Sequence, residues 1–438
     1  VLASAGVMNP QIRFGEDLMS RVSYVMMNPG GDLEMTKVIR EAINDLAVKV
    51  STQAKRELDE IVEVSFVGNP IMHHLLLGIN PIELGGAPFA LATDESVRVR
   101  ARDLNLKLHI NTRCYVLPCI AGHVGADTAG MILSEAPHHR EAMTLLVDIG
   151  TNAEIVLGNN ERLLAASSPT GPAFEGAQIS SGQRAAPGAI ERVRIDRETL
   201  EPRFQVIGSE LWSNDPGFAK DTKGIGVTGI CGSGIIEVIA EMYLAGILSQ
   251  DGVINGALAA KSKHIIADGR TFSYVLSNGQ HMIQVTQNDV RAIQLAKAAL
   301  YAGIRLLMER MEIKTVDRIR LAGAFGSHID VKYAMVLGLI PDCDLEQVSS
   351  AGNAAGTGAR IALLNYESRQ EIEEVVREVE KVETAVEANF QEHFVQAMAF
   401  PHKVDSFPNL AKVIELPAET DLQNNADSNQ HRKIRRRR

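Results

Sequence analysis

The feature that most constrains the fold is an apolar run that a polar turn divides in two. Residues 145–147 (LLV) lead into Asp148, Ile149, Gly150, Thr151 and Asn152, and residues 153–157 (AEIVL) follow. Short apolar runs on either side of turn residues predict two strands joined by a tight turn. Residues 162–168 can supply a third strand of the same meander. The chain is therefore expected to contain a sheet whose first strand ends in a carboxylate.

The residues of this turn have the chemistry of a phosphate site. Gly150 allows backbone N–H groups to approach phosphate oxygens, and Thr151 and Asn152 add side-chain donors. A carboxylate does not bind phosphate, so the role expected of Asp148 is to hold Mg²⁺, directly or through water. The alternative is a plain hairpin, in which Asp, Gly and Asn are common residues. The turn alone leaves both interpretations open.

Three further glycine-rich segments are candidates for ligand contact. After a predicted buried strand at 319–322, a turn of small residues can let a flat adenosine group lie against bare backbone. Its residues are Gly323, Ala324, Phe325 and Gly326. Close packing of the strand on a helix explains this turn equally well, and residues 352–358 are best explained as a helix entry turn. In residues 226–234, Gly232 and Ser233 begin a predicted helix. This segment is interpreted either as a hinge between lobes or as a phosphate contact.

Composition excludes several classes of function. The chain has 438 residues, which favours two or three domains or lobes, and its net charge of -10 argues against general nucleic-acid binding. It has no apolar stretch long enough to span a bilayer and no signal peptide, so we expect a cytoplasmic protein without a membrane partner. The four cysteines, Cys114, Cys119, Cys231 and Cys343, have no cluster or zinc spacing, and we interpret them as buried free thiols.

Periodicity predicts alternating helices and strands along the chain, which is typical of α/β layers. Strands are expected at 1–6, 61–67 and 114–117, besides those already described. Helices are expected at about 15–27, 34–54, 72–77, 127–133 and 371–382. A capping sequence that begins at Thr286 opens a long helix to about Met311.

The order of the candidate segments resembles that of the superfamily of acetate and sugar kinases, Hsp70 and actin. Four other segments resemble a narrower family, the reductive activators of corrinoid proteins. These segments are 9–17 (NPQIRFGED), 68–78 (GNPIMHHLLLG), 117–127 (LPCIAGHVGAD) and 171–177 (GPAFEGA). The resemblance runs from about residue 1 to 408 in the family's order. It implies a two-lobed, actin-like α/β ATPase with ribonuclease H-like lobes and a nucleotide cleft between them.

The resemblance also implies a function. Such activators use ATP and Mg²⁺ to return an inactive Co(II) corrinoid to Co(I) in a methyltransferase system. The expected partners are a corrinoid protein and an electron donor, and the resemblance favours a homodimer. By the same resemblance, phosphate and Mg²⁺ are expected to bind at Asp148, Gly150, Thr151 and Asn152. Asp127 and Glu175 lie beside glycines in matching segments and could orient a hydrolytic water, although a helix-start Asp and a turn Glu explain them as well.

This sequence departs from the family pattern at its beginning. The family's electron enters through an N-terminal [2Fe–2S] domain and its ATPase module opens with another Asp-x-Gly-Thr turn, and neither occurs in the sequence given. We interpret residues 1–142 as an N-terminal lobe without its first phosphate hairpin. Residues 143–417 are interpreted as a C-terminal lobe, and 418–438 as a disordered polar and basic tail.

Two alternative functions stay open at this stage. The first is a small-molecule kinase of the same fold, for which no segment specifies a substrate. The second is a non-enzymatic docking module that ATP regulates. His73 and His74 could touch a ligand, but a core or surface pair explains them better.

Overall fold

The computed structural model describes residues 1–279, 281–326 and 328–417, and the predicted tail at 418–438 lies outside this range. Two compact units make up the chain, and neither is continuous in the sequence. Among the described residues, the first unit consists of 1–148, 154–167 and 351–383, and the second of 149–153, 168–350 and 384–417. Residues 351–383 belong to the first unit although residues 168–350 of the second unit precede them, and the order of the sequence does not suggest this. The expected lobe boundary at 142 and 143 stays a prediction.

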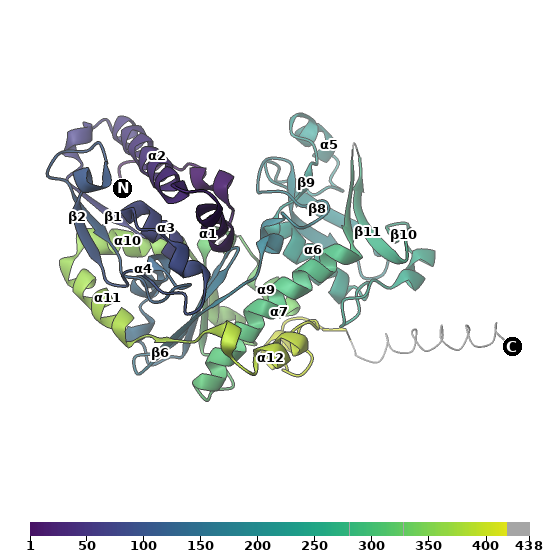
Figure 1. Cartoon of the computed structure of the whole chain (residues 1–438). Coiled ribbons are helices and arrows are strands. Elements are labelled where there is room, and N and C mark those ends of the chain that lie inside the picture. The colour runs from purple at the N-terminus through teal and green to yellow at the C-terminus, as the bar shows by residue number, and fades with distance from the viewer. Residues whose placement is uncertain (280, 327, 418–438) are drawn as a thin grey trace. The chain divides into compact units, whose positions relative to one another are not determined.

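The first unit combines two groups of strands with helices (Figure 1). Strands β1, β3 and β2 form one sheet, in which β1 and β3 are parallel and β2 is antiparallel to β3. Strands β4, β5, β6 and β15 are successive neighbours in another sheet. The elements are α1 (Leu18–Met27), α2 (Gly31–Ala54), β1 (Glu63–Phe66), α3 (Pro70–Leu77), β2 (Val97–Arg100), β3 (Arg113–Val116), α4 (Ala126–Glu135), β4 (Thr144–Ile149), β5 (Ala153–Gly158), β6 (Leu163–Ser168), α10 (Ala354–Leu364), α11 (Tyr366–Glu378) and β15 (Glu380–Lys381).

The second unit contains two three-stranded sheets and the long helix α7, which packs against α12 (Figure 1). One sheet has the order β8-β7-β9 and the other is the antiparallel meander β10-β11-β12. The elements are β7 (Ala189–Ile195), β8 (Pro202–Val206), α5 (Phe218–Asp221), β9 (Gly229–Ile230), α6 (Gly232–Leu244), β10 (Ile265–Asp268), β11 (Thr271–Asn278), β12 (Met282–Thr286), α7 (Gln287–Arg310), β13 (Arg318–Ala322), α8 (Gly323–Gly326), α9 (Val331–Leu337), β14 (Val348–Gly352), α12 (Phe390–Gln396) and α13 (Pro408–Ala411).

Local sequence signals explain the start of α7. The Thr286 hydroxyl accepts a hydrogen bond from the Asp289 N–H (3.2 Å), and Asp289 in turn accepts one from the Thr286 N–H (2.8 Å). This reciprocal capping box satisfies two donors that the first turn would otherwise leave unpaired. The buried Asp289 also accepts from the N–H and hydroxyl of Ser180, so the cap ties α7 to the preceding loop. The helix predicted from Thr286 to about Met311 is confirmed.

One secondary-structure prediction is wrong, and one predicted helix has different bounds. Residues 1–9 form no strand, because an extended segment becomes a strand only when it joins a β-sheet, and no strand of the described residues forms a sheet with this segment. The helix predicted at 371–382 is α11, which begins at Tyr366 and ends at Glu378. It begins early because the Asn365 side chain caps it, and it ends early because Glu380 and Lys381 pair in parallel with β6.

Several buried groups match simple expectations. All four cysteines are buried and free, and burial raises the pKa of Cys114 and of Cys343 to about 11. His73 and His74 form a buried pair with their Nδ1 atoms 3.4 Å apart. Within the described part of the chain, no helix is both long and apolar enough to cross a membrane.

Candidate functional site

Three carboxylates gather in the first unit around the end of β4 and the start of α4. Asp148 is the penultimate residue of β4, Glu154 the second residue of β5, and Asp127 the second residue of α4. The Thr128 N–H donates to the Asp127 carboxylate at 2.9 Å, and the Asp127 N–H donates to the Gly68 carbonyl at 3.3 Å. The structure therefore brings two predicted site residues together and adds Glu154, which the sequence analysis missed.

The start of α4 depends on a close contact between two of the family-like segments. A Cβ at Gly125, which caps the helix, would lie 2.6 Å from the Asn69 Cα and 2.7 Å from the Gly68 carbonyl oxygen. Such distances are shorter than real Cβ contacts, so only glycine fits without a shift of the backbone. The segments 68–78 and 117–127 thus meet where Asp127 is held.

Burial and mutual repulsion disturb the ionisation of this carboxylate cluster. Burial raises the pKa of Asp127 to about 6, and the charge of Asp148 adds to the rise, although the Thr128 N–H opposes it. Burial also raises the pKa of Asp148. The pKa of Glu154 is raised well above its usual value by burial and by the charges of Asp127 and Asp148. Each ionised carboxylate here makes the ionisation of the next more costly.

The donor chemistry of the carboxylate cluster is compatible with a cation. None of the three side chains has an ion-pair partner among the described residues, so a cation would relieve their repulsion. Their oxygens do not all lie within 4.8 Å of one another, which argues against one ion ligated directly by all three. Mg²⁺ commonly keeps several waters and takes only one or two carboxylates. Asp148 is the predicted metal residue, and the geometry is compatible with that role.

The turn after Asp148 is organised by residues of the second unit. The Gly150 N–H donates to the Asn152 carbonyl at 3.0 Å, which closes the turn. The Thr170 hydroxyl donates to the carbonyls of Gly150 (2.8 Å) and Thr151 (3.1 Å). The carbonyl groups of the turn are thereby held from one side by protein donors. The sequence-predicted tight turn between two strands is confirmed, and its phosphate-binding role stays a prediction.

Glu175 contacts this turn through the side chain of Thr151. The Thr151 hydroxyl donates to the Glu175 carboxylate at 2.9 Å. Glu175 ends a short 3₁₀ helix (Pro172–Glu175), and Gly176 follows with φ 85°, a left-handed conformation that favours glycine. Glu175 is exposed. The structure therefore joins two predicted site residues that lie 24 positions apart in the sequence.

Gly232 and Ser233 begin α6, as predicted, but their surroundings indicate packing. The Ser233 hydroxyl lies 3.4 Å from the Cys231 sulfur and is buried. A Cβ at Gly234 would lie 2.3 Å from the Ile190 carbonyl oxygen of β7. The glycines thus let α6 approach β7 closely. The hinge and phosphate roles of Gly232 and Ser233 stay untested predictions.

The adenosine candidates form the short helix α8 directly after β13. Gly323 has φ 84°, and a Cβ at Gly326 would lie 3.0 Å from the Leu321 carbonyl carbon. The side chains of Ala324 and Phe325 lie outside what the structure describes. Residues 352–358 begin α10, where the Asn353 side chain accepts from the Gly356 N–H at 2.8 Å, so the interpretation as a helix entry turn is confirmed.

Comparison with known proteins identifies the family. A family model described as the C-terminal domain of RACo, the ASKHA domain, matches residues 142–411, and a model described as the RACo middle region matches residues 1–140. The chain is 33% identical over 416 residues to the corrinoid activation enzyme RamQ of Eubacterium limosum, covering 92% of this chain and 67% of that protein.

Two further proteins are similar. The chain is 27% identical over 361 residues to a Methanosarcina barkeri protein named [Co(II) methylated amine-specific corrinoid protein] reductase, covering 78% of this chain and 63% of the reductase. A solved structure of a reductive activator for corrinoid,iron-sulfur protein matches with a TM-score of 0.77 and 33% identity, covering 90% of this chain and 61% of that one. The chain thus spans about two thirds of the length of these proteins. It belongs to the RACo family of reductive activators of corrinoid proteins and contains the family's middle region and its C-terminal ASKHA domain.

Proposed function

We propose that this chain is the ATPase portion of an activator that reduces the Co(II) corrinoid of a methyltransferase-system protein to Co(I). The observation that carries the proposal is the match to both RACo regions, in order and over almost the whole described chain. The names of the two similar proteins support it, since one is a corrinoid activation enzyme and the other a Co(II) corrinoid protein reductase.

The proposed reaction couples the transfer of one electron to the hydrolysis of ATP. One electron passes from a donor of low potential to Co(II), which becomes Co(I), and ATP is hydrolysed to ADP and phosphate. Co(I) is so strongly reducing that ordinary donors do not regenerate it without an energy source. We propose an iron–sulfur protein or domain as the donor, as the resemblance to the activator family implies.

We propose that the residues around the turn at 149–153 bind the phosphates and the metal. Mg²⁺, when bound, supplies positive charge that offsets charge on the phosphate oxygens. Asp148 would hold this ion, and donors of Thr151 and Asn152 would contact phosphate. The Gly150 N–H would contact phosphate after leaving the Asn152 carbonyl to which it donates in this structure. Asp127 is the proposed general base for water, since a pKa of about 6 lies close to the working pH of a base. The backbone of 323–326 is the proposed adenosine contact.

The first test is calorimetric titration of ATP–Mg²⁺ into the wild-type chain and the Asp148→Ala variant. We expect binding by the wild type and its loss in the variant. Asp59→Ala, which removes an exposed carboxylate of the same unit, is the matched control and should bind like the wild type. Equal binding by wild type and Asp148→Ala would refute the assignment of the metal site.

The second test addresses the corrinoid. The chain, a low-potential iron–sulfur donor and a Co(II) corrinoid protein are mixed with ATP–Mg²⁺, and Co(I) is followed by visible absorption. We expect Co(I) only with ATP. Nucleotide binding without turnover in the presence of the corrinoid protein would favour an ATP-regulated docking module, and phosphate transfer to a small acceptor would favour a kinase.

A further inference from the structure

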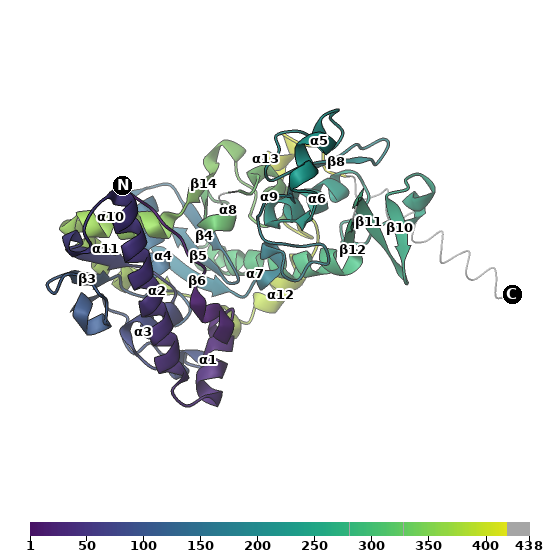
Figure 2. The same ribbon diagram turned by 90° about the horizontal axis from the view of Figure 1, so that it is seen from above.

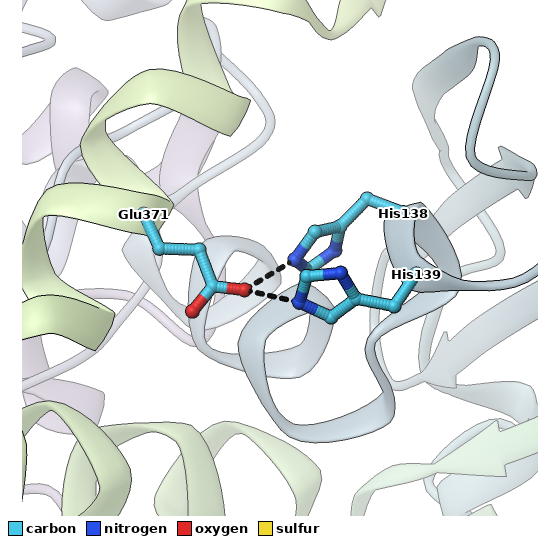
Figure 3. Close-up of side chains that lie close together, drawn as sticks. All are labelled: His138, His139 and Glu371. Carbon is cyan, nitrogen blue, oxygen red and sulfur yellow. Dashed lines mark hydrogen bonds and ion pairs between the residues drawn. The ribbon is translucent and has the colours of Figure 1, made fainter.

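Two consecutive histidines and one glutamate meet in the first unit, away from the carboxylate cluster. Ala136 ends α4 in a left-handed conformation (φ 48°), and the next three residues form a 3₁₀ turn (Pro137–His139). His138 Nε2 and His139 Nε2 lie 2.7 Å and 2.6 Å from the same oxygen of Glu371, which comes from α11. Figure 3 shows both rings directed at that one carboxylate oxygen. Three potential ligand atoms therefore share one small volume.

Neighbouring contacts fix the helix that carries Glu371. Arg369 donates to the Ala362 carbonyl and pairs with Glu63 of β1 at 2.8 Å. Glu373 accepts from the Ser96 hydroxyl (2.6 Å), Arg98 (2.6 Å) and the Tyr115 hydroxyl (3.0 Å). These contacts lie on either side of Glu371 along the chain and hold α11 against the β1-β3-β2 sheet. Glu371 is thus a preorganised ligand, which reduces the entropic cost of binding.

The charge around this cluster favours a cation. Glu371 contributes a carboxylate to the cluster, and one of its oxygens lies 2.7 Å from His138 Nε2 and 2.6 Å from His139 Nε2. Glu367 and Glu374, four residues before and three after Glu371, share its helix face and are exposed. They add negative potential where an ion would approach.

We propose that His138, His139 and Glu371 form a binding site for a divalent transition-metal cation of the Zn²⁺ type. Two imidazoles and one carboxylate are a ligand set that such ions take, with remaining positions open to water. The three ligand atoms lie within 4.8 Å of one another. Metal–ligand bonds of about 2.0–2.1 Å place tetrahedral ligands about 3.3 Å apart. Since the nitrogens now lie 2.6 and 2.7 Å from the oxygen, the cluster must open by ~0.6 Å.

Exposure makes the opening feasible and also limits the affinity. The His139 side chain is 63% exposed and can rotate, whereas His138 is only 11% exposed and provides a fixed ligand. Binding at Nε2 leaves the ring proton of His138 on Nδ1, which is buried and has no hydrogen-bond partner among the described groups. Metal-binding histidines usually donate that proton to an acceptor. We therefore expect affinity in the micromolar range rather than the tighter binding of structural zinc sites.

The place of the cluster in the fold suggests what the ion would do. Asp127 lies in the first turn of α4, and His138 and His139 follow the other end of this helix. An ion shared with Glu371 would join that end to α11, and it would stabilise the unit that contains the carboxylate cluster. This role is independent of nucleotide and of corrinoid.

The test is calorimetric titration of Zn²⁺ into chelator-treated wild-type chain without a polyhistidine tag, with Co²⁺ as a spectroscopic probe. With Mg²⁺ present to occupy the carboxylate cluster, we expect one Zn²⁺ per chain, and with Co²⁺ intense visible bands that report a low coordination number. His139→Ala and Glu371→Gln should each weaken Zn²⁺ binding by more than about 10-fold. Even the loss of a residue that only supports a metal ligand weakens metal binding by about 10-fold. Zn²⁺ should also raise the midpoint of thermal unfolding in the wild type but not in these variants.

Two control variants test whether the binding depends on this cluster rather than on other exposed histidines and carboxylates. His281→Ala removes an exposed histidine of the second unit, and Glu374→Gln removes a carboxylate one turn along α11, so both should keep the wild-type affinity within about 3-fold. Circular dichroism confirms that each variant is folded. Absence of saturable binding by the folded wild type overturns the proposal, as does full affinity in His139→Ala or an equal loss in His281→Ala.

Discussion

Gly358 of α10 packs directly on Gly130 of α4. A Cβ at position 358 would lie 1.9 Å from the Gly130 carbonyl oxygen and 2.5 Å from its Cα. The two helices can approach this closely only because both positions lack a side chain. Figure 2 shows α10 alongside α4. The contact fixes the helix that carries Asp127, although it lies outside the carboxylate cluster itself.

Gly358→Ala is therefore expected to destabilise the first unit. The added methyl group meets backbone atoms, which cannot rotate away, so the helices must separate at a cost of about 2–3 kcal/mol. Urea unfolding followed by circular dichroism measures the change. Gly86→Ala is the control, because position 86 is extended (φ -139°) and has no atom within 4 Å of a new Cβ. Equal stability of the two variants would contradict the close contact.

Asp127→Asn is expected to stabilise the chain at pH 7.5 in the absence of Mg²⁺ and nucleotide. The pKa of Asp127 is about 6 in the folded state against an ordinary value of 3.8, so folding favours its protonated form. The stability this group contributes is complete below pH 3.8 and is lost as pH rises through about 6. An uncharged Asn avoids that loss and should gain roughly 1–2 kcal/mol.

The pH dependence provides the check on this prediction. The advantage of Asp127→Asn should shrink as pH falls from 7.5 towards 4, where the wild-type carboxyl is also neutral, and denaturant unfolding at several pH values measures it. Because Asn keeps an oxygen that can accept from the Thr128 N–H, the helix start is preserved. An advantage that does not depend on pH would show that charge is not its cause. The same variant should lose ATP hydrolysis if Asp127 is the base.

Thr151→Val tests the hydrogen bond between the turn and Glu175. Both groups are accessible, so the loss of one hydrogen bond should change stability by only about 0.5 kcal/mol. Loss of a positioned donor should lower kcat for ATP hydrolysis on the order of 100-fold. Thr151→Ser keeps the hydroxyl and should retain most activity. If Val and Ser behave alike in the ATPase assay, the Thr151 hydroxyl has no role in turnover.

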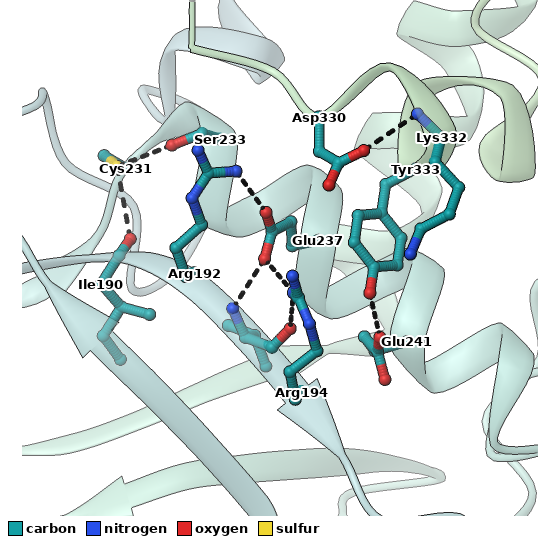
Figure 4. Close-up of polar contacts among 11 residues, drawn as sticks. Ile190, Arg192, Arg194, Cys231, Ser233, Glu237, Glu241, Asp330, Lys332 and Tyr333 are labelled. Atoms are coloured by element: carbon teal, nitrogen blue, oxygen red, sulfur yellow. Dashed lines mark hydrogen bonds and ion pairs between the residues drawn. The ribbon is translucent and has the colours of Figure 1, made fainter. Parts of the chain in front are cut away.

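Glu237→Ala should destabilise the second unit. Glu237 of α6 is 1% exposed and accepts from Arg192 (2.7 Å), Arg194 (2.5 Å) and the Val193 N–H (2.9 Å), as Figure 4 shows. The variant leaves a buried N–H without an acceptor and separates two arginines from their counter-charge. Because the arginines are partly exposed and can turn to water, we expect a loss of roughly 2–3 kcal/mol in denaturant unfolding.

The control for this network is another glutamate of the same unit. Glu198→Ala changes an exposed side chain and should remain within about 0.5 kcal/mol of the wild type. A loss as large as that of Glu237→Ala would mean that burial of the network is not what stabilises it.

The parts of this structure that were predictable are those encoded by neighbouring residues. Thr286 and Asp289 cap α7 across three positions, and the turn after Asp148 follows from apolar runs on either side. These signals are local, so no knowledge of distant contacts is needed. The family segments were equally readable, because each is a short continuous motif.

The missed features depend on contacts between distant residues. Glu154 had one weak local signal, since a carboxylate is unusual in an otherwise apolar strand, but its proximity to Asp127 arises only when β5 joins β4. The pairing of Glu380 with β6, which ends α11, joins residues more than 200 positions apart. Likewise, His139 and Glu371 are 232 positions apart and show no spacing pattern along the chain.

The interleaving of the two units sets an order for folding during synthesis. The first unit is not complete until residues 351–383 have been made, about 200 residues after Asp148. At translation rates of about 5–20 residues per second, α10 is synthesised roughly 10–40 s after α4. Throughout that interval the backbone face at Gly130 is uncovered while the second unit is synthesised. In a nascent chain of this protein, the first unit therefore stays incomplete for longer than the length of that unit would suggest.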